Sequence, residues 1–375
     1  MRVVIVAESF LPRVNGVSGS VLRATRHLIS QGHDVHIIAP DPAPSTTPEG
    51  VQVHAVKSFS VPGMGVDVGY ALASTLRQVL QQLRPDVVHL ASPLILGYQA
   101  MRAASWLGLP TVAVFQTDIS GFARHYRLAG VGSLSDAVLR RIHKEADLTL
   151  VPSSASLEYL RHLGVDRVAM WGRGVDAEQF DPRNRCPELR TRWLSPHPDR
   201  VVVGYVGRLA PEKRVDILRS IRHDPRIKLV VIGDGPQREE LQTLLPQAHF
   251  TGMLRGPELG IAVASLDILV APGERETFCQ VIQEGMASGL AVIAPDIGGP
   301  RDLVVHAEVG LRYRPGDDEH FATCVDALVA SPAARAVMGA SARSMIRDRT
   351  WTRIGDDLVG HYRSVLRGMD VDLVA

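Results

Sequence analysis

Hydrophobic residues in the first half of the chain gather in short β-branched runs. These runs read as strands at 2–7, 34–39, 51–56, 86–91, 111–115 and 148–152. Most are continuous rather than alternating, which is typical of a parallel sheet covered on both faces. Segment 17–33 carries its apolar residues on one helical stripe and reaches a stop signal at Gly32. The pattern predicts a doubly wound α/β domain.

The second half repeats this pattern. Apolar runs recur at 200–207, 227–233, 266–272 and 290–295, with helical patterns between them. Segment 180–200 carries four prolines and no long apolar run, so we predict the linker there. A chain of 375 residues also favours two domains. We therefore predict two Rossmann-like domains, 1–180 and 181–349, that face a cleft, and expect the helix at about 350–375 to pack back on the first.

Composition excludes several classes of protein. The hydrophobic fraction of 45% and the charged fraction of 22% indicate a globular chain. With 41 basic and 40 acidic residues the net charge is +1, so we expect no nucleic-acid partner. Three cysteines without a C-x-x-C pair indicate a reducing compartment. No apolar stretch approaches the roughly 18 residues of a spanning helix, so we expect a cytoplasmic protein, or one peripheral on the inner face of the membrane.

Two loops after predicted strands are candidate anion sites. Gly16 follows the first strand in an Asn-Gly loop that opens onto a helix N-terminus, although a G-x-G-x-x-G fingerprint is missing. An ordinary turn is the alternative. Arg208 and Lys213 lie five apart after the run at 200–207, in a loop that suits a diphosphate. A solvated charged loop is the alternative there.

The stretch ERETFCQVIQEGMASG, residues 274–289, places Glu276 and Glu284 eight apart. It follows the run at 266–272 and reads as a helix over 278–289, so the amides of 277–281 are expected at the helix N-terminus, a seat for phosphate. Glu276 stands just outside that helix. Glu284 lies about one turn or more inside it, within reach of ribose hydroxyls. The alternative is that both are ordinary surface acids.

This stretch resembles the E-x(7)-E motif of the retaining glycosyltransferases of family four, which have the two-domain GT-B fold. GRLAPEKRVD, WGRGVDAEQF and FTGML resemble further motifs of that family, in the expected order. ESFLPRVNGVSGSVLR resembles the N-terminal loop of its actinobacterial GDP-mannose-dependent α-mannosyltransferases and of its sulfoquinovosyl-lipid transferases. The resemblance covers roughly residues 1–350.

The resemblance implies a role for each matching residue. Arg208 and Lys213 would neutralise the leaving diphosphate, Glu276 would lie near the hydroxyls of the transferred sugar, and Glu284 would bind the ribose. Further donor contacts are implied for Gly16, for the backbone of Phe278, Cys279 and Gln280, and for Gly233 and Met253 on the nucleotide side.

Asp118 departs from the family pattern. Many relatives have a histidine in the loop after the fifth strand, where this chain has Asp118. An aspartate donates no proton to a phosphate at neutral pH unless its pKa is strongly raised, but it accepts hydrogen bonds from sugar hydroxyls. The alternative is a structural aspartate in a turn.

The resemblance implies transfer of a hexose, in the first place mannose from GDP-mannose, to a hydroxyl of a glycolipid or other sugar acceptor. Neither a metal nor a cofactor beyond the nucleotide sugar is expected, and the D-x-D at 370–372 reads as tail. Alternatives are a UDP-sugar-dependent transferase of the same fold, such as one for sulfoquinovosyl- or glucosyl-lipid synthesis, a nucleotide-sugar epimerase, and a non-catalytic nucleotide-sugar-binding protein. A nicotinamide oxidoreductase is opposed by the missing fingerprint.

The basic segment 122–147 is the candidate membrane contact. Arg140 and Arg141 lie in an amphipathic helical pattern that suits anionic lipid. A solvated helix face is the alternative. Membrane-associated relatives often use a lysine-rich helix further upstream, but the matching region 73–86 has only two arginines.

Overall fold

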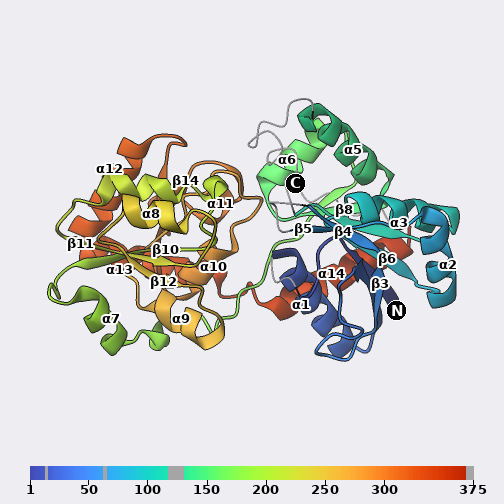
Figure 1. The fold of residues 1–375 in the computed structure, drawn as a ribbon, viewed down its shortest axis with the longest axis horizontal. Helices are drawn as coiled ribbons and strands as arrows, with labels where there is room; N and C mark the ends of the chain where they lie inside the picture. Colours follow the sequence, from blue (N-terminus) through green and yellow to red (C-terminus); the bar gives the residue numbers. More distant parts are fainter. Residues whose placement is uncertain (13–15, 62–65, 117–130, 369–375) are drawn as a thin grey trace. The chain divides into compact units, whose positions relative to one another are not determined.

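The computed structural model describes residues 1–12, 16–61, 66–116 and 131–368 (Figure 1). The chain divides into two compact units, one of Met1–Gly172 with Thr352–Ala375 and one of Arg173–Trp351. The change of unit therefore lies before the predicted boundary at 180/181. Segment 180–200 is no linker, because its helix α7 (Pro187–Leu194) places Trp193 in a core of the second unit.

The first unit is built on a parallel seven-stranded sheet in the order β3-β2-β1-β6-β7-β8-β9. Its strands are β1 (Arg2–Ala7), β2 (Asp34–Pro40), β3 (Val53–Val56), β6 (Val87–Ala91), β7 (Thr111–Val114), β8 (Leu148–Val151) and β9 (Val168–Met170). Its helices are α1 (Gly16–Ser30), α2 (Ala73–Leu83), α3 (Ile95–Trp106), α5 (Val131–Glu145), α6 (Ser154–His162) and α14 (Trp351–Leu366). All six predicted strands of the first half are present. The antiparallel hairpin of β4 (Ser58–Val61) and β5 (Val66–Gly69) was not predicted.

Alternation along β1 explains why this sheet is covered on both faces. Val3 and Ile5 belong to a core shared with α1 and α14, whereas Val4 and Val6 belong to a core shared with α2 and α3. The C-terminal helix α14 packs closely on α1, because a Cβ on Gly355 would lie 2.3 Å from the His27 ring.

The second unit has a parallel six-stranded sheet in the order β12-β11-β10-β13-β14-β15. Its strands are β10 (Val201–Val206), β11 (Ile227–Ile232), β12 (His249–Gly252), β13 (Ile268–Val270), β14 (Ala291–Pro295) and β15 (Gly310–Tyr313). Besides α7, its helices are η1 (Pro182–Asn184), η2 (Pro211–Lys213), η3 (Val215–Ile221), α8 (Arg238–Leu244), α9 (Gly256–Ala264), α10 (Gln280–Ala287), α11 (Gly298–Leu303), α12 (Asp318–Ala330) and α13 (Pro332–Ile346). The four predicted strands are present, and the motif FTGML, residues 250–254, lies partly in β12.

The same alternation covers the second sheet. Val202 and Val206 of β10 face one core, and Val203 and Tyr205 face the other. Among the described residues, no single helix is long and apolar enough to cross a membrane; α12 and α13 pass that test only together, with a bend of 101° between them.

Candidate functional site

The carboxyl ends of the parallel strands in the second unit collect most of the predicted site residues. Arg208 and Lys213 follow β10, Gly233 follows β11, and Glu276 follows β13. In a parallel sheet these ends share one edge, which is where open α/β sheets bind ligands. Residues far apart in the sequence therefore belong to one region of the unit.

Lys213 and Glu276 form an ion pair at this edge. The ammonium of Lys213, at the end of η2, donates a hydrogen bond to Oε1 of Glu276. The two side chains are 29% and 19% exposed. Burial lowers the pKa of Lys213, but the charge and the hydrogen bond of Glu276 outweigh burial, so this pKa lies above its ordinary value. The side chain of Lys213 is therefore protonated and positively charged at neutral pH. The sequence predicted a separate role for each residue and not their direct contact.

Arg208 presents its guanidinium to solvent from a fixed backbone. Its side chain is 57% exposed, and Nη1 lies 3.8 Å from Glu212 Oε1. The carbonyl of Arg208 accepts a hydrogen bond of 2.8 Å from the Tyr205 hydroxyl. On either side, the amide of Gly207 donates to the Ile232 carbonyl at the end of β11 and the amide of Leu209 donates to the Asp234 carbonyl, both at 2.9 Å. A guanidinium on a loop that hydrogen bonds hold in place is suited to binding an anion.

Gly233 is required for two loops to approach each other. Its φ is +139°, and a Cβ there would lie 1.9 Å from the carbonyl oxygen of Gly207. The glycine thus positions the loop that carries Arg208. Met253, just after β12, is 59% exposed, and its sulfur lies 3.2 Å from Nη2 of Arg255. The structure leaves Met253 accessible, as a nucleotide-side residue requires.

The start of α10 differs from the prediction. The helix begins at Gln280 rather than at 278, because Cys279 has a φ of +75° and Phe278 precedes it in the loop. Burial raises the pKa of the Cys279 thiol. The amide of Ile282 donates to the Cys279 carbonyl at 3.1 Å. The amides of Gln280 and Val281 come before this bond, at the helix N-terminus, which is an anion-binding feature of helices.

A glycine pair after β14 supports this turn, a role that the sequence did not predict. The amide of Gly299 donates to the Glu276 carbonyl at 2.8 Å. A Cβ on Gly299 would lie 2.4 Å from the Cα of Phe278. The signal was available, since two adjacent glycines, Gly298 and Gly299, come two residues after the run at 290–295, at the same sheet edge.

Glu284 lies one turn inside α10 and is half-buried. Two glutamines of the same helix bind backbone carbonyls outside it. Nε2 of Gln280 donates to the Gly174 carbonyl at 2.9 Å, and Nε2 of Gln283 donates to the Arg173 carbonyl at 3.0 Å. The side chain of Gln280 is thus used structurally, which leaves its backbone for the predicted donor contact.

The remaining predicted residues belong to the first unit. Gly16 is the first residue of α1, and a Cβ there would meet no atom within 4 Å. Asp118 lies outside the described residues, as does the D-x-D at 370–372, so both interpretations stay predictions. Within the described ranges there is no group of three or more His, Cys, Asp or Glu side chains suited to a metal ion.

Glu8 is a further carboxylate at a sheet edge that the sequence reasoning missed. It follows β1, and its Oε1 accepts hydrogen bonds from the amides of Leu94 at 2.5 Å and Gly97 at 2.8 Å. Burial raises its pKa to about 7, although these hydrogen bonds act in the opposite direction. A charged residue directly after a buried strand was the available signal.

Comparison with known proteins identifies the family. Residues 14–179 match Glycosyltransferase Family 4, and residues 189–345 match Glycosyl transferases group 1. The chain belongs to glycosyltransferase family 4. The predicted family is thereby confirmed, and the enzyme is a glycosyltransferase. It is 48% identical over 98% of both chains to the GDP-mannose-dependent alpha-mannosyltransferase of Mycolicibacterium smegmatis. It is 46% identical over 97% of both chains to the protein of that name from Mycobacterium tuberculosis.

Solved structures confirm the predicted GT-B fold class of this glycosyltransferase. The Anabaena protein HepE, crystallised with UDP, superposes with a TM-score of 0.78 over 97% of this chain and 100% of its own, at 16% identity. At that identity the likeness concerns the fold alone.

Proposed function

We propose that this glycosyltransferase moves mannose from GDP-mannose to a hydroxyl of a glycolipid acceptor, with retention of the anomeric configuration. The observation that carries the proposal is the Lys213–Glu276 ion pair at the strand ends, beside the start of α10. It joins a cation for a leaving diphosphate to a carboxylate for a sugar. The names of the two mycobacterial relatives support mannose and GDP.

In this proposal the donor is held by groups of the second unit. Arg208 and Lys213 bind the diphosphate, and the backbone at 278–280 holds the phosphate and sugar end. Glu284 accepts hydrogen bonds from the ribose hydroxyls. Gly233 and Met253 border the nucleotide.

The transfer step exchanges one bond for another at the anomeric carbon. The bond to the diphosphate oxygen breaks, and the acceptor oxygen forms a new bond on the same face of the sugar. The departing phosphate takes the proton of the acceptor hydroxyl, so no side-chain base is needed. Arg208 and Lys213 stabilise the charge on the leaving group. On this mechanism, turnover should persist in excess EDTA, and loss that magnesium or manganese restores would contradict it.

We also propose that the enzyme works as a peripheral protein on the inner face of the cytoplasmic membrane. Arg140, Arg141 and Lys144 are exposed on α5, which supports contact with anionic lipid.

The test combines titration with product analysis. Calorimetry with GDP, UDP and ADP should give the tightest binding for GDP. Incubation with GDP-mannose and octyl glycosides as soluble acceptors should release GDP and form an α-mannoside, identified by the one-bond coupling at its anomeric carbon. Preference for UDP would replace the donor, a β-product would exclude retention, and binding without turnover on any acceptor would favour a nucleotide-sugar sensor.

A further inference from the structure

Arg214, the residue after Lys213, has an unusual backbone conformation. Its φ of 53° and ψ of 35° lie in the left-handed region, which is unfavourable for a residue with a Cβ. Such a conformation persists when surrounding interactions hold it, and these residues gather near functional sites. The contacts of the Arg214 side chain show what holds it here.

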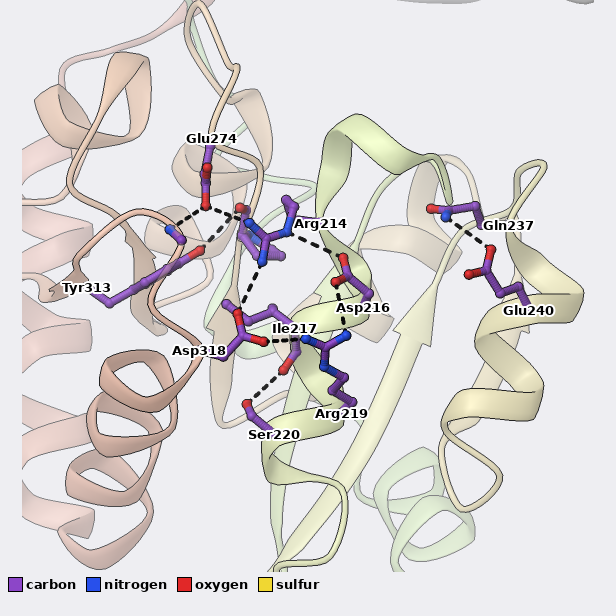
Figure 2. Close-up of polar contacts among 12 residues, drawn as sticks. Arg214, Asp216, Ile217, Arg219, Ser220, Gln237, Glu240, Glu274, Tyr313 and Asp318 are labelled. Atoms are coloured by element: carbon purple, nitrogen blue, oxygen red, sulfur yellow. Dashed lines mark hydrogen bonds and ion pairs between the residues drawn. The ribbon is translucent and has the colours of Figure 1, made fainter. Parts of the chain in front are cut away.

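The guanidinium of Arg214 meets three carboxylates. Nη1 lies 3.0 Å from Glu274 Oε1, Nη2 lies 3.1 Å from Asp318 Oδ1, and Nε lies 3.5 Å from Asp216 Oδ1. Figure 2 shows Arg214 between Glu274 and Asp318, and it shows Arg219 bound to the second oxygen of Asp318. A single arginine thus joins the loop after β10 to the loop after β13 and to the first residue of α12.

The Arg214 contacts run beside the Lys213–Glu276 pair. Two consecutive cations of one loop, Lys213 and Arg214, bind Glu276 and Glu274, which are two residues apart on the other loop. The amide of Gly316 donates to the same Oε1 of Glu274 at 2.8 Å. The side chains of Arg214, Glu274 and Asp318 are 24–28% exposed, so water screens these pairs less than surface pairs.

We propose that Arg214 is a positioning residue that, through Glu274, fixes the placement of Glu276 against Lys213. The proposal rests on the proposed function of the Lys213–Glu276 pair. Only a planar fork reaches Glu274 and Asp318 together from one position, so lysine at 214 keeps the charge but loses this connection.

The experiment measures turnover of Arg214→Lys, with Arg226→Lys as the matched control. Arg226 also joins two carboxylates from different segments, Asp224 and Asp326, but it precedes β11 at the opposite edge of the sheet. Arg214→Lys should lower kcat by about tenfold, and Arg226→Lys by less than about twofold. Glu274→Gln, which keeps an acceptor for Gly316, should follow Arg214→Lys.

A double-mutant cycle separates positioning from general stabilisation. If Arg214 acts by placing Glu276 against Lys213, then Arg214→Lys should change turnover by less than about twofold in a Lys213→Ala background, while its effect on urea unfolding should persist there.

Several outcomes overturn the inference. Equal turnover of Arg214→Lys and Arg226→Lys does so, as does an undiminished Arg214→Lys effect without Lys213. Arg214→Gly is the second variant, because glycine adopts the left-handed conformation readily and folding should survive; wild-type turnover of this variant also overturns the inference. Failure of the proposed function would appear separately, as wild-type protein without turnover or as a Lys213→Ala variant with unchanged turnover.

Discussion

Glu8 in the first unit and Glu276 in the second both follow a buried parallel strand, but different groups neutralise them. Oε1 of Glu8 accepts hydrogen bonds from the amides of Leu94 and Gly97, at the start of α3. Oε1 of Glu276 accepts one from the ammonium of Lys213, which comes from the neighbouring strand end. Similar sheets thus hold a carboxylate at the edge by fixed backbone dipoles in one case and by a side-chain cation in the other.

The two sheet edges differ in whether the group that binds the carboxylate can move to another anion. Backbone amides cannot move away from Glu8, and burial leaves its carboxyl with a pKa of about 7. The Lys213 side chain can turn from Glu276 toward another anion without unfolding any element. The second unit is therefore the one whose edge is suited to hold and release a diphosphate, and Arg208 adds a solvent-facing cation to it.

The largest effect is expected from removing the cations of the second unit. Lys213→Ala and Arg208→Ala should each cost about 2–4 kcal/mol of transition-state stabilisation, which is roughly 30- to 1,000-fold in kcat/KM. Lys213→Ala should be the more severe, because it also leaves Glu276 without its partner. Steady-state kinetics with GDP-mannose measures both, and Lys228→Ala, which removes a lysine bound to the Gln247 carbonyl, is the control. Wild-type turnover in both variants would show that the site is misplaced.

A second prediction separates the two glutamates. Glu284→Gln should weaken GDP and donor binding together and raise the donor KM, because ribose is common to both ligands. Glu276→Gln should leave GDP affinity nearly intact and lower turnover by about 2–4 kcal/mol, because GDP lacks the sugar. Calorimetry with GDP beside donor kinetics checks this. The reverse pattern would exchange the two roles, and unchanged binding and turnover in both would leave only surface acids.

The sheets could be predicted from the sequence because their signal is local. Continuous apolar runs located all ten of the proposed strands, since burial on both faces imposes the pattern on each strand separately. The hairpin of β4 and β5 was missed because it has no such run. Polar residues interrupt the β4 sequence SFSV, and its Phe59 is exposed. The unit boundary was placed too late, because the prolines of 180–200 also suit the short turns and helix starts found there.

The residues of the site could be predicted from the sequence, but the contacts between them could not. The spacing of Glu276 and Glu284 and the order of the motifs identified the residues. The Lys213–Glu276 pair joins positions 63 apart in the sequence, and the Arg214–Asp318 contact joins positions 104 apart. No local pattern encodes such partners, since they meet only when β10, β13 and β15 lie in one sheet.

A third prediction uses pH to test the carboxylate of the first unit. The pKa of Glu8, about 7 in the folded chain against an ordinary 4.5, means that the folded state holds a proton between these values that the unfolded state has lost. Stability should therefore fall as pH rises from 4.5 to 7. Glu8→Gln keeps an acceptor for the two amides and removes the charge. It should be about 1–3 kcal/mol more stable than wild type at pH 8, a range reduced because Glu8 is only half-buried.

Urea unfolding of both proteins from pH 4.5 to 8 measures this difference. The two stability curves should meet near pH 4.5 and separate toward pH 7. Parallel curves would show that Glu8 is charged throughout and that backbone amides neutralise it as fully as a lysine would. Glu276→Gln, run in the same series, extends the comparison to the second unit.

The smallest effect is expected at the outer surface, where α5 gives the first unit its proposed membrane contact. Arg141 already has partners within the protein, because its Nε lies 2.9 Å from Glu145 Oε1 and its guanidinium lies 5.4 Å from the centre of the Tyr98 ring. Reversing Arg140 and Arg141 to Glu should therefore weaken sedimentation with anionic liposomes by only about three- to tenfold at low salt. The difference should shrink as salt rises, because the interaction is screened. Reversal of two exposed arginines of the second unit, Arg192 and Arg347, is the matched control. Equal binding of the α5 variant and wild type would exclude this helix as the contact, whereas an equal loss in both variants would mean that the lipid senses net charge and not a surface of the first unit.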